Sequence, residues 1–329
     1  MSASIEACER IVCACALLLA GCGGPQSALE PAGRGAERIA LLFWWMAGGT
    51  AVIWLAVVGL AVYAFRVQPG PRGKQTALLI IGGGAVVPTL VLGVLLAFGL
   101  AEMPGLLAPA PEGSLRIAVT GEQFWWRVRY LPPSREPVEL ANEIRLPVGE
   151  PVQLILESPD VIHSFWVPSI AGKMDMIPGR VTRLTLEPTR TGTFRGACAE
   201  FCGESHALMG FHVVVQERED FARWLERQGA SARPAAGLAA RGRELFLANG
   251  CGACHTVRGT PADGVVGPDL THVGSRVSLG AGILRNEPGG FRRWIASPEH
   301  VKPGVLMPAF GMLPAGDLQA LAAWLEELE

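Results

Sequence analysis

The sequence has no excess of charge of either sign, and its cysteines do not form a disulfide pattern. The 28 Lys and Arg residues nearly balance the 30 Asp and Glu residues, and the formal net charge is -2. Without a basic excess, no nucleic-acid partner is expected. Of the 8 cysteines, four lie in residues 1–22 and the other four form two close pairs. Close pairs of this kind indicate metal binding and argue against a disulfide-stapled scaffold.

Charge is absent altogether from two long stretches, residues 39–65 and 76–101, in a chain that is 50% hydrophobic. Each stretch exceeds the roughly 20 residues that cross a bilayer as a helix. Residues 39–101 are therefore predicted to form a transmembrane hairpin, with a buried core helix as the alternative. The loop 66–75 carries basic residues and no acid, which places it in the cytoplasm and the C-terminal part outside the bacterial inner membrane. Residues 82–84 are all glycine and predict a kink or close packing against a partner helix.

The N-terminus has the pattern of a secretion signal. An apolar run over residues 11–20 is followed by Gly21 and Cys22, which is typical of a bacterial lipoprotein. We therefore predict a signal peptide at 1–21, lipidation of Cys22 and a periplasmic segment at 22–38. Because the first residues are more acidic than basic, an ordinary signal peptide, an uncleaved anchor and a misassigned start are alternatives.

Soft metal ligands are concentrated in residues 198–209, which read CAEFCGESHALM. Two thiols, an imidazole and a thioether form the kind of ligand set that selects copper. With His163 as a second imidazole, there are too many ligands for one ion, and two metals that share both sulfurs fit better. A structural zinc site of two Cys and two His is the alternative, although zinc would have no use for Met209.

This pattern resembles the binuclear copper A site of cytochrome c oxidase subunit II. Residues 161–168 and 175–180 are also similar to that family. The resemblance implies that both thiolates bridge the coppers and that a glutamate contributes its backbone carbonyl. It implies this ligand set: His163, Cys198, Glu200, Cys202, His206 and Met209. It also implies that the carboxylate of Glu200 faces a magnesium site shared with subunit I.

Short alternating strands bounded by Pro and Gly follow the second apolar stretch. They predict an antiparallel all-β sandwich, and we expect a cupredoxin domain over residues 102–217. His212 alternates with valines and is expected to be a structural strand residue.

An aromatic segment of this domain is similar to the Gln-Trp-Tyr-Trp segment of the family, whose first Trp receives electrons from soluble cytochrome c. Here Phe124 stands at that position, which argues against direct delivery of that kind. Phe124, Trp125 and Trp126 are the candidates for receiving electrons, with core and interface packing as the alternative.

A short helix and a flexible Gly- and Ala-rich linker are expected over residues 218–235. The following sequence Cys-Gly-Ala-Cys-His is the attachment signature of a c-type heme, in which Cys251 and Cys254 form thioethers and His255 ligates the iron. Alone, such a pair could also be a redox or zinc pair. Gly242 and Phe246 precede it at the spacing of the first helix of a class I cytochrome c, and an amphipathic stretch at 318–328 supplies the last helix.

Residues 236–329 thus resemble an all-α class I cytochrome c domain. The sixth iron ligand should be a methionine. Met307 precedes a proline, as in the family, and Met312 is the alternative. Pro268 is expected to offer its carbonyl to the second ring nitrogen of His255. His272 and His300 are expected to be exposed polar residues.

Together these features predict subunit II of a caa-type oxidase, a multidomain chain that relays electrons to an enzyme complex. Electrons would pass from heme c to copper A and then to the heme of subunit I, which reduces oxygen to water and acts as a respiratory translocase. The resemblance implies subunits I and III as partners and a soluble or membrane cytochrome c as donor. The copper A subunit of a nitric oxide reductase and a free-standing electron carrier are alternatives. The hairpin argues against the latter, because a carrier needs only one anchor.

Overall fold

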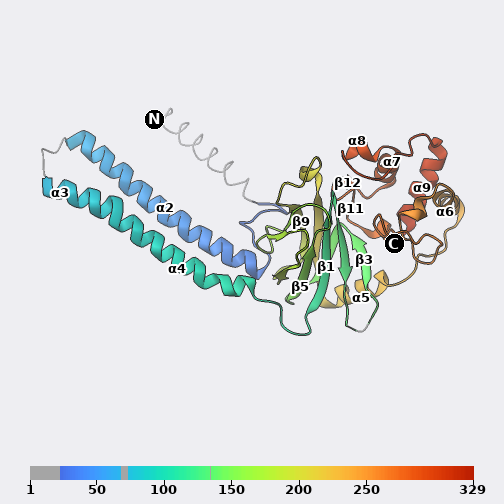
Figure 1. Cartoon of the computed structure of the whole chain (residues 1–329), viewed down its shortest axis with the longest axis horizontal. Helices are drawn as coiled ribbons and strands as arrows, with labels where there is room; N and C mark the ends of the chain where they lie inside the picture. Colours follow the sequence, from blue (N-terminus) through green and yellow to red (C-terminus); the bar gives the residue numbers. More distant parts are fainter. Residues whose placement is uncertain (1–22, 68–72, 134) are drawn as a thin grey trace, which may run out of the picture. The chain divides into compact units, whose positions relative to one another are not determined.

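The computed structural model describes residues 23–67, 73–133 and 135–329, and the chain divides into two compact units (Figure 1). One unit is Arg38–Ala108, and the other combines the residues before it with Pro109–Glu329. The predicted signal peptide and the predicted lipidation site, Cys22, lie outside the described residues, as does part of the predicted cytoplasmic loop.

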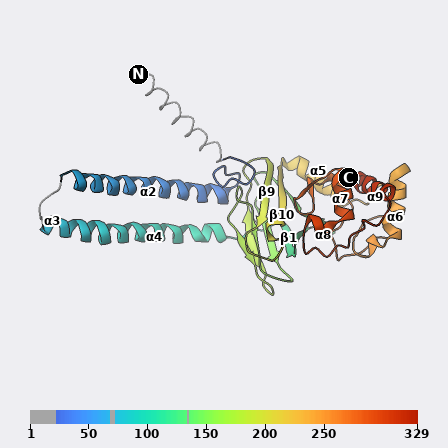
Figure 2. The ribbon, with the colours of Figure 1, turned by 90° about the horizontal axis from the view of Figure 1, so that it is seen from above.

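The first unit is a hairpin of two long apolar helices that run side by side in both views (Figures 1 and 2). Its first helix is α2 (Arg34–Val67), and its second is continuous through α3 (Gly73–Leu78), η2 (Leu79–Val86) and α4 (Val87–Leu107). Both helices are long and apolar enough to cross a membrane. The glycines at 82–84 lie in η2, which is a π-helix. The predicted irregularity is therefore a widened turn of a kind that is rare inside α-helices.

The second unit contains two five-stranded sheets that pack face to face. The strand orders are β3-β2-β1-β5-β8 and β4-β10-β9-β6-β7. The strands are β1 (Leu115–Glu122), β2 (Trp125–Tyr130), β3 (Val138–Ala141), β4 (Glu143–Pro147), β5 (Val152–Glu157), β6 (His163–Trp166), β7 (Met174–Met176), β8 (Thr182–Leu186), β9 (Gly192–Cys198) and β10 (Gly210–Gln216).

The predicted sandwich is confirmed, but the prediction of a wholly antiparallel one is wrong. β1 pairs in parallel with β5, and β10 pairs in parallel with β4. In each pair, the chain between the two strands passes through the other sheet, so the second strand can run in the same direction as the first.

Alternating residues of both sheets meet in one apolar core. The burial pattern of β10, in which every second residue is buried, shows the period of two that the sequence predicts. Phe165 stacks on Phe211 with ring centroids 4.7 Å apart, and Trp126 packs edge-on against Phe165. A Cβ atom at Gly196 would lie 2.1 Å from the ring of Phe211. Only glycine therefore lets this ring lie flat across β9.

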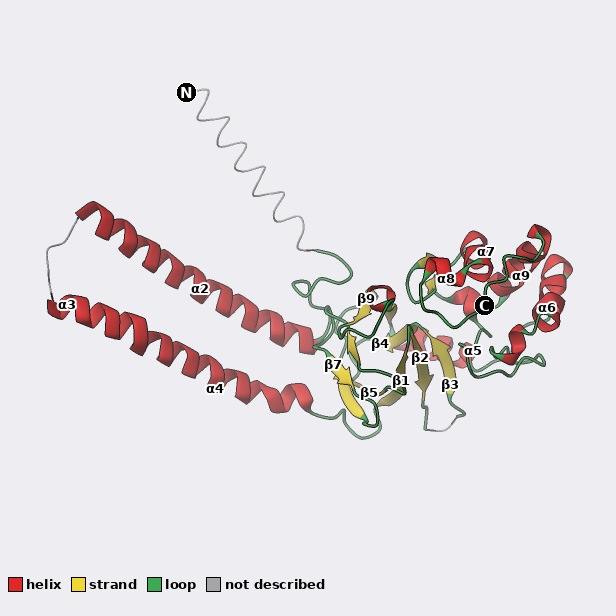
Figure 3. Ribbon diagram, turned by 45° about the horizontal axis from the view of Figure 1, so that its top comes forward, coloured by secondary structure: helices red, strands yellow, loops and turns green. Residues whose placement is uncertain are grey.

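The C-terminal part of the second unit is mostly helical, as Figure 3 shows by colour. Its elements are α5 (Arg218–Gln228), α6 (Gly237–Ala248), η4 (Cys251–Ala253), η5 (Val273–Ser275), β11 (Ser278–Leu279), β12 (Leu284–Arg285), α7 (Pro288–Ala296), α8 (Pro298–Val301) and α9 (Ala315–Glu327). A Cβ atom at Gly242 would lie 2.0 Å from the carbonyl oxygen of Ala320, and Phe246 meets Trp324 with ring centroids 4.9 Å apart. The predicted contact between the first and last helices is confirmed.

Candidate metal centres

The sandwich gathers the predicted copper ligands at one end. His163 is the first residue of β6 and Cys198 is the last of β9, while the other ligands follow in the loop from β9 to β10. One ring nitrogen of His163 and the sulfurs of Cys198 and Cys202 all lie within 4.8 Å of one another. His206 Nδ1 is 3.6 Å and Met209 Sδ is 3.8 Å from Cys202 Sγ. Two strand ends and one loop thus bring five side-chain donors together.

The backbone carbonyl of Glu200 joins this cluster, because it lies 3.1 Å from the sulfur of Cys198. Glu200 itself is exposed, unlike the candidate sulfur ligands Cys198, Cys202 and Met209. The structure therefore separates the two groups of Glu200, with the carbonyl at the sulfurs and the side chain at the surface.

The thiols of Cys198 and Cys202 shift each other's pKa in opposite directions. A hydrogen bond from Cys202 is the main cause that lowers the pKa of Cys198 to about 3, and holding that proton is the main cause that raises the pKa of Cys202. A lowered pKa favours the thiolate of Cys198, which is the form of cysteine that binds metals.

Asp160 contacts a candidate ligand and was not predicted from the sequence. Burial lowers the pKa of His163, but hydrogen bonds to Cys198 and Asp160 outweigh it and raise that pKa overall. Nε2 of His163 lies 2.9 Å from Asp160 Oδ1, while Nδ1 lies 3.9 Å from Cys198 Sγ. A carboxylate on the outer nitrogen fixes the ring of a metal-ligating histidine. The signal was an Asp three residues before the candidate ligand.

The predicted heme attachment residues lie on the turn after α6. Cys251 opens η4, Cys254 follows it, and Gly250 takes a left-handed φ of 74° to allow the turn. His255 Nδ1 lies 2.8 Å from the carbonyl oxygen of Pro268, which confirms the predicted contact. Burial lowers the pKa of His255 and outweighs that hydrogen bond. The ring is therefore kept neutral, which is the form that ligates iron.

The two candidate sulfur ligands for the iron differ in exposure. Met307 is half-buried against the core of the helical domain, whereas Met312 is 77% exposed. The position of Met307 thus suits a ligand better. His300 is exposed as expected, but the expectation for His272 is wrong: it is 6% exposed and bonds to the carbonyl of Ala230.

The candidate residues for receiving electrons differ among themselves. Trp126 is fully buried in the sandwich core, and its Nε1 lies 3.4 Å from the carbonyl oxygen of Met209. Trp125 is half-buried, with the guanidinium of Arg127 4.7 Å from its ring. Phe124 is only 5% exposed. Core packing, the alternative to electron entry, thus describes Trp126, because its side chain does not reach the surface.

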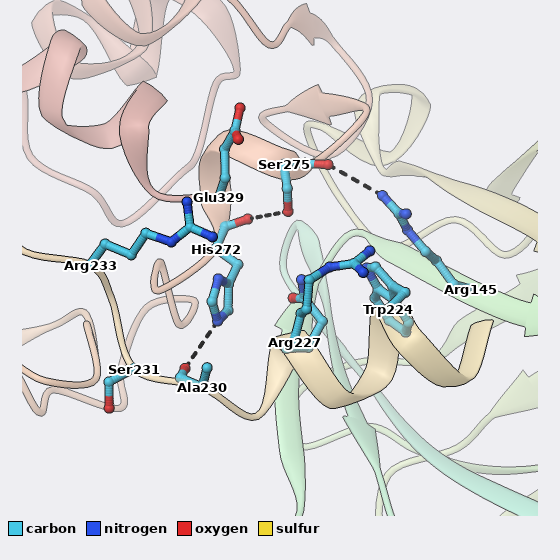
Figure 4. A pocket seen from close by; sticks show the side chains of 10 residues that line it. Arg145, Trp224, Arg227, Ala230, Ser231, Arg233, His272, Ser275 and Glu329 are labelled. Carbon is cyan, nitrogen blue, oxygen red and sulfur yellow. Dashed lines mark hydrogen bonds between the residues drawn. The ribbon is translucent and has the colours of Figure 1, made fainter. Parts of the chain in front are cut away.

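The predicted linker is not free in this structure. Arg258 donates to the carbonyl of Gln228 at 2.6 Å, and Ala232 donates to the carbonyl of Arg258. A pocket of about 450 Å³ beside it is lined by arginines, among other residues, and Figure 4 shows the hydrogen bonds of His272 and Ser275 there. Hydrogen bonds at Gln228, Ala230 and Ala232 hold the first part of this segment, although its composition predicted flexibility.

Comparisons with known proteins agree with both domains. A family profile described as the periplasmic domain of cytochrome c oxidase subunit II matches residues 131–217, and a cytochrome c profile matches residues 239–329. "Cytochrome c oxidase subunit 2" of Alkalihalophilus pseudofirmus is 36% identical over 95% of this chain and 94% of that protein. The chain belongs to the cytochrome c oxidase subunit 2 family.

Other members and solved structures are similar over different lengths. The subunit 2 of Bacillus subtilis is 28% identical over 95% of both chains. The crystal structure of the periplasmic domain of subunit II (CoxB) of Bradyrhizobium japonicum is 32% identical, with a TM-score of 0.34, and covers 36% of this chain and 96% of that one.

Membership in this family implies a membrane-anchored subunit that works with oxidase subunit I. The two domains imply copper A and heme c, and the residues present fit both groups. Two sulfurs, two imidazoles, a thioether and a carbonyl suit copper. The Cys pair, the neutral imidazole of His255 and the half-buried thioether of Met307 suit a covalent heme.

Proposed function

We propose that the chain relays electrons from a cytochrome c donor through its heme c domain to its copper A domain, and on to the heme of subunit I for reduction of oxygen to water. The observation that carries the proposal is a direct contact between the two loops that bear ligands. Ser205 Oγ, next to the copper ligand His206, donates to the carbonyl of Pro303 at 2.6 Å. Pro303 lies four residues before Met307.

Each domain would hold its group with the residues described above. Copper A would be held by His163, Cys198, Glu200, Cys202, His206 and Met209, and heme c by Cys251, Cys254, His255 and Met307. When bound, these groups supply one-electron chemistry. The chain contributes position: the buried sheet ends hold the copper ligands so that little needs to move, and Asp160 and Pro268 orient the two histidine rings.

We further propose the placement of the chain in the complex. The basic loop between the helices would lie in the cytoplasm, and both cofactor domains would lie on the periplasmic side. The exposed carboxylate of Glu200 would face a magnesium site at subunit I, and subunit III would complete the complex. Cys22 would carry the lipid anchor, which mass spectrometry of the mature N-terminus can check. The names of the relatives favour oxygen over nitric oxide as the substrate.

The test removes the heme domain. A chain that ends at Gln228 should still assemble copper A in the complex but be reduced much more slowly by soluble cytochrome c. A tethered donor acts at an effective concentration in the millimolar range, far above that of a dilute soluble protein. In this shortened chain, Phe124→Trp should restore part of the rate.

Stopped-flow reduction of copper A, at matched donor concentration, measures both chains, and the copper A spectrum shows that the shortened chain is intact. Equal rates in the full and shortened chains would mean that the fused heme is not the main route.

A further inference from the structure

Lys302 reaches from the cytochrome c domain to the segment that supports the copper loop. Its side chain is almost wholly buried, with the residue 1% exposed. Nζ donates to the carbonyl of Phe124 and lies 3.4 Å from the carbonyl of Gly280. Gln123, the neighbour of Phe124, donates from Nε2 to the carbonyl of Cys202 at 2.6 Å. Two side chains and one backbone step therefore link the heme domain to a copper ligand.

The ring of Phe124 fills the space between the two domains at the same place. A Cβ atom at Gly304 would lie 3.0 Å from this ring, and a Cβ atom at Gly203 would lie 3.2 Å from it. Gly203 follows the copper ligand Cys202, and Gly304 lies two residues after Lys302. Two glycine backbones, one from each domain, thus pack against the same aromatic ring. A larger residue at either glycine would press on this ring and require a shift of a few tenths of an ångström.

Burial makes a lysine an unusual choice for this position. Removing an amine from water is costly unless its donors are used, and an apolar side chain would fill the same space. Among the described residues, no ion pair involves Lys302. Its hydrogen bonds go to backbone carbonyls of both domains. A donor with two backbone partners fixes a position more narrowly than apolar packing does, because it requires defined directions.

We propose that Lys302 is a positioning residue, which holds the heme-ligand loop against the copper loop through the carbonyl of Phe124. The inference rests on the proposed passage of electrons from heme c to copper A. In that step one electron leaves ferrous heme, which becomes ferric, and the copper pair is reduced by that electron, with no proton required. Lys302 does not react; it sets the distance over which the electron moves.

The experiment compares variants of the full chain in the intact oxidase complex. Lys302→Glu places an acceptor against two carbonyl acceptors, and Lys302→Arg keeps a donor. Arg241→Glu is the matched control, because it makes the same charge reversal on the same domain at a side chain that is 61% exposed. Ser205→Ala removes the neighbouring contact from the copper side, so the test does not depend on Lys302 variants alone.

Two quantities are measured on each variant. One is the rate of electron transfer from heme c to copper A after rapid photoreduction of the heme. The other, independent of activity, is deuterium uptake by residues 123–126 and 203–206. Lys302→Glu should lower the rate about tenfold or more, because it removes a donor from buried carbonyls, and leaving buried polar groups without a partner costs about that factor in a docking equilibrium. It should also raise uptake in both segments.

Lys302→Arg should restore most of the rate, and Ser205→Ala should show a smaller loss of the same kind. Heme and copper spectra should be unchanged in all variants. Unchanged rate and uptake in Lys302→Glu, or an equal loss in Arg241→Glu, would overturn the positioning role while leaving the electron route intact. An unmodified complex that shows no transfer from heme to copper would instead overturn the proposed function.

Discussion

The two metal centres of this chain are built in different ways. The candidate copper centre draws its residues from strand ends and one loop, and His163, Cys198, Cys202 and Met209 are all at most 7% exposed. In the heme domain, by contrast, Cys254 is exposed and Cys251 is half-buried. The sandwich therefore shapes the copper centre by its own packing. The candidate heme residues lie instead on the turn after α6 and on the loop of Met307 in the helical domain.

Cys202→Ser should have the largest effect, because it should disrupt the copper centre and leave the heme centre intact. It should abolish the spectrum of copper ions that share two thiolates, because one bridge is lost, and it should stop the relay. The heme spectrum should stay normal, since that centre has its own scaffold. Optical and paramagnetic spectra of the purified complex decide the outcome.

Met209→Leu is the milder comparison: an axial thioether binds weakly, so the variant should keep both coppers and mainly shift their potential.

A zinc ion in the unmodified site, or a single copper with a blue-copper spectrum, would contradict the binuclear assignment. A heme spectrum lost together with copper would show that the two centres do not fold independently.

The parts of this molecule that follow a local pattern could be read from the sequence. Charge-free stretches gave the helices of the hairpin, alternation gave strands such as β5 and β10, and the spacing of Gly242 and Phe246 gave the contact with α9. Ligand types and spacing likewise predicted that His163, Cys198 and Cys202 lie close together. Each of these signals repeats over a few residues or comes from a fixed motif, so no knowledge of distant contacts is needed.

Contacts between distant segments could not be read in this way. Nothing near Lys302 indicates that it bonds to Phe124, because the two lie in different domains and no periodicity relates them. The prediction that His272 is exposed failed for the same reason, because its ring bonds to the carbonyl of Ala230 in the linker. The parallel pairing of β1 with β5 depends on how connections cross between the sheets. Burial by another domain is a tertiary effect that overrides local polarity.

The heme centre can be tested by the choice between its two methionines. Met307→Ala should make the heme high-spin or lower its potential by on the order of 100 mV, a small part of the roughly 0.8 V that axial ligands can set. Losing a thioether favours the ferric iron. Met312→Ala is the matched control and should change neither property, because this side chain is 77% exposed. A normal low-spin spectrum and potential in the Met307 variant would contradict the assignment.

The smallest expected effect concerns pH at the contact between the two domains. Burial lowers the pKa of Lys302 from 10.5 to about 7, against a smaller opposing influence of Cys202. A lysine released to water regains its ordinary pKa, so the docked state binds fewer protons than the undocked state between these two values. Docking is then favoured as pH rises through this window, by up to about tenfold per pH unit for one proton, and the gain is lost as pH falls toward 7.

Deuterium uptake by residues 203–206 of the intact complex should accordingly fall between pH 7 and pH 9, after correction for the intrinsic exchange rate. Lys302→Met, which cannot titrate, should show no such slope. A flat profile in the unmodified protein, or the same slope in the Met variant, would show that the proton is not taken up by Lys302.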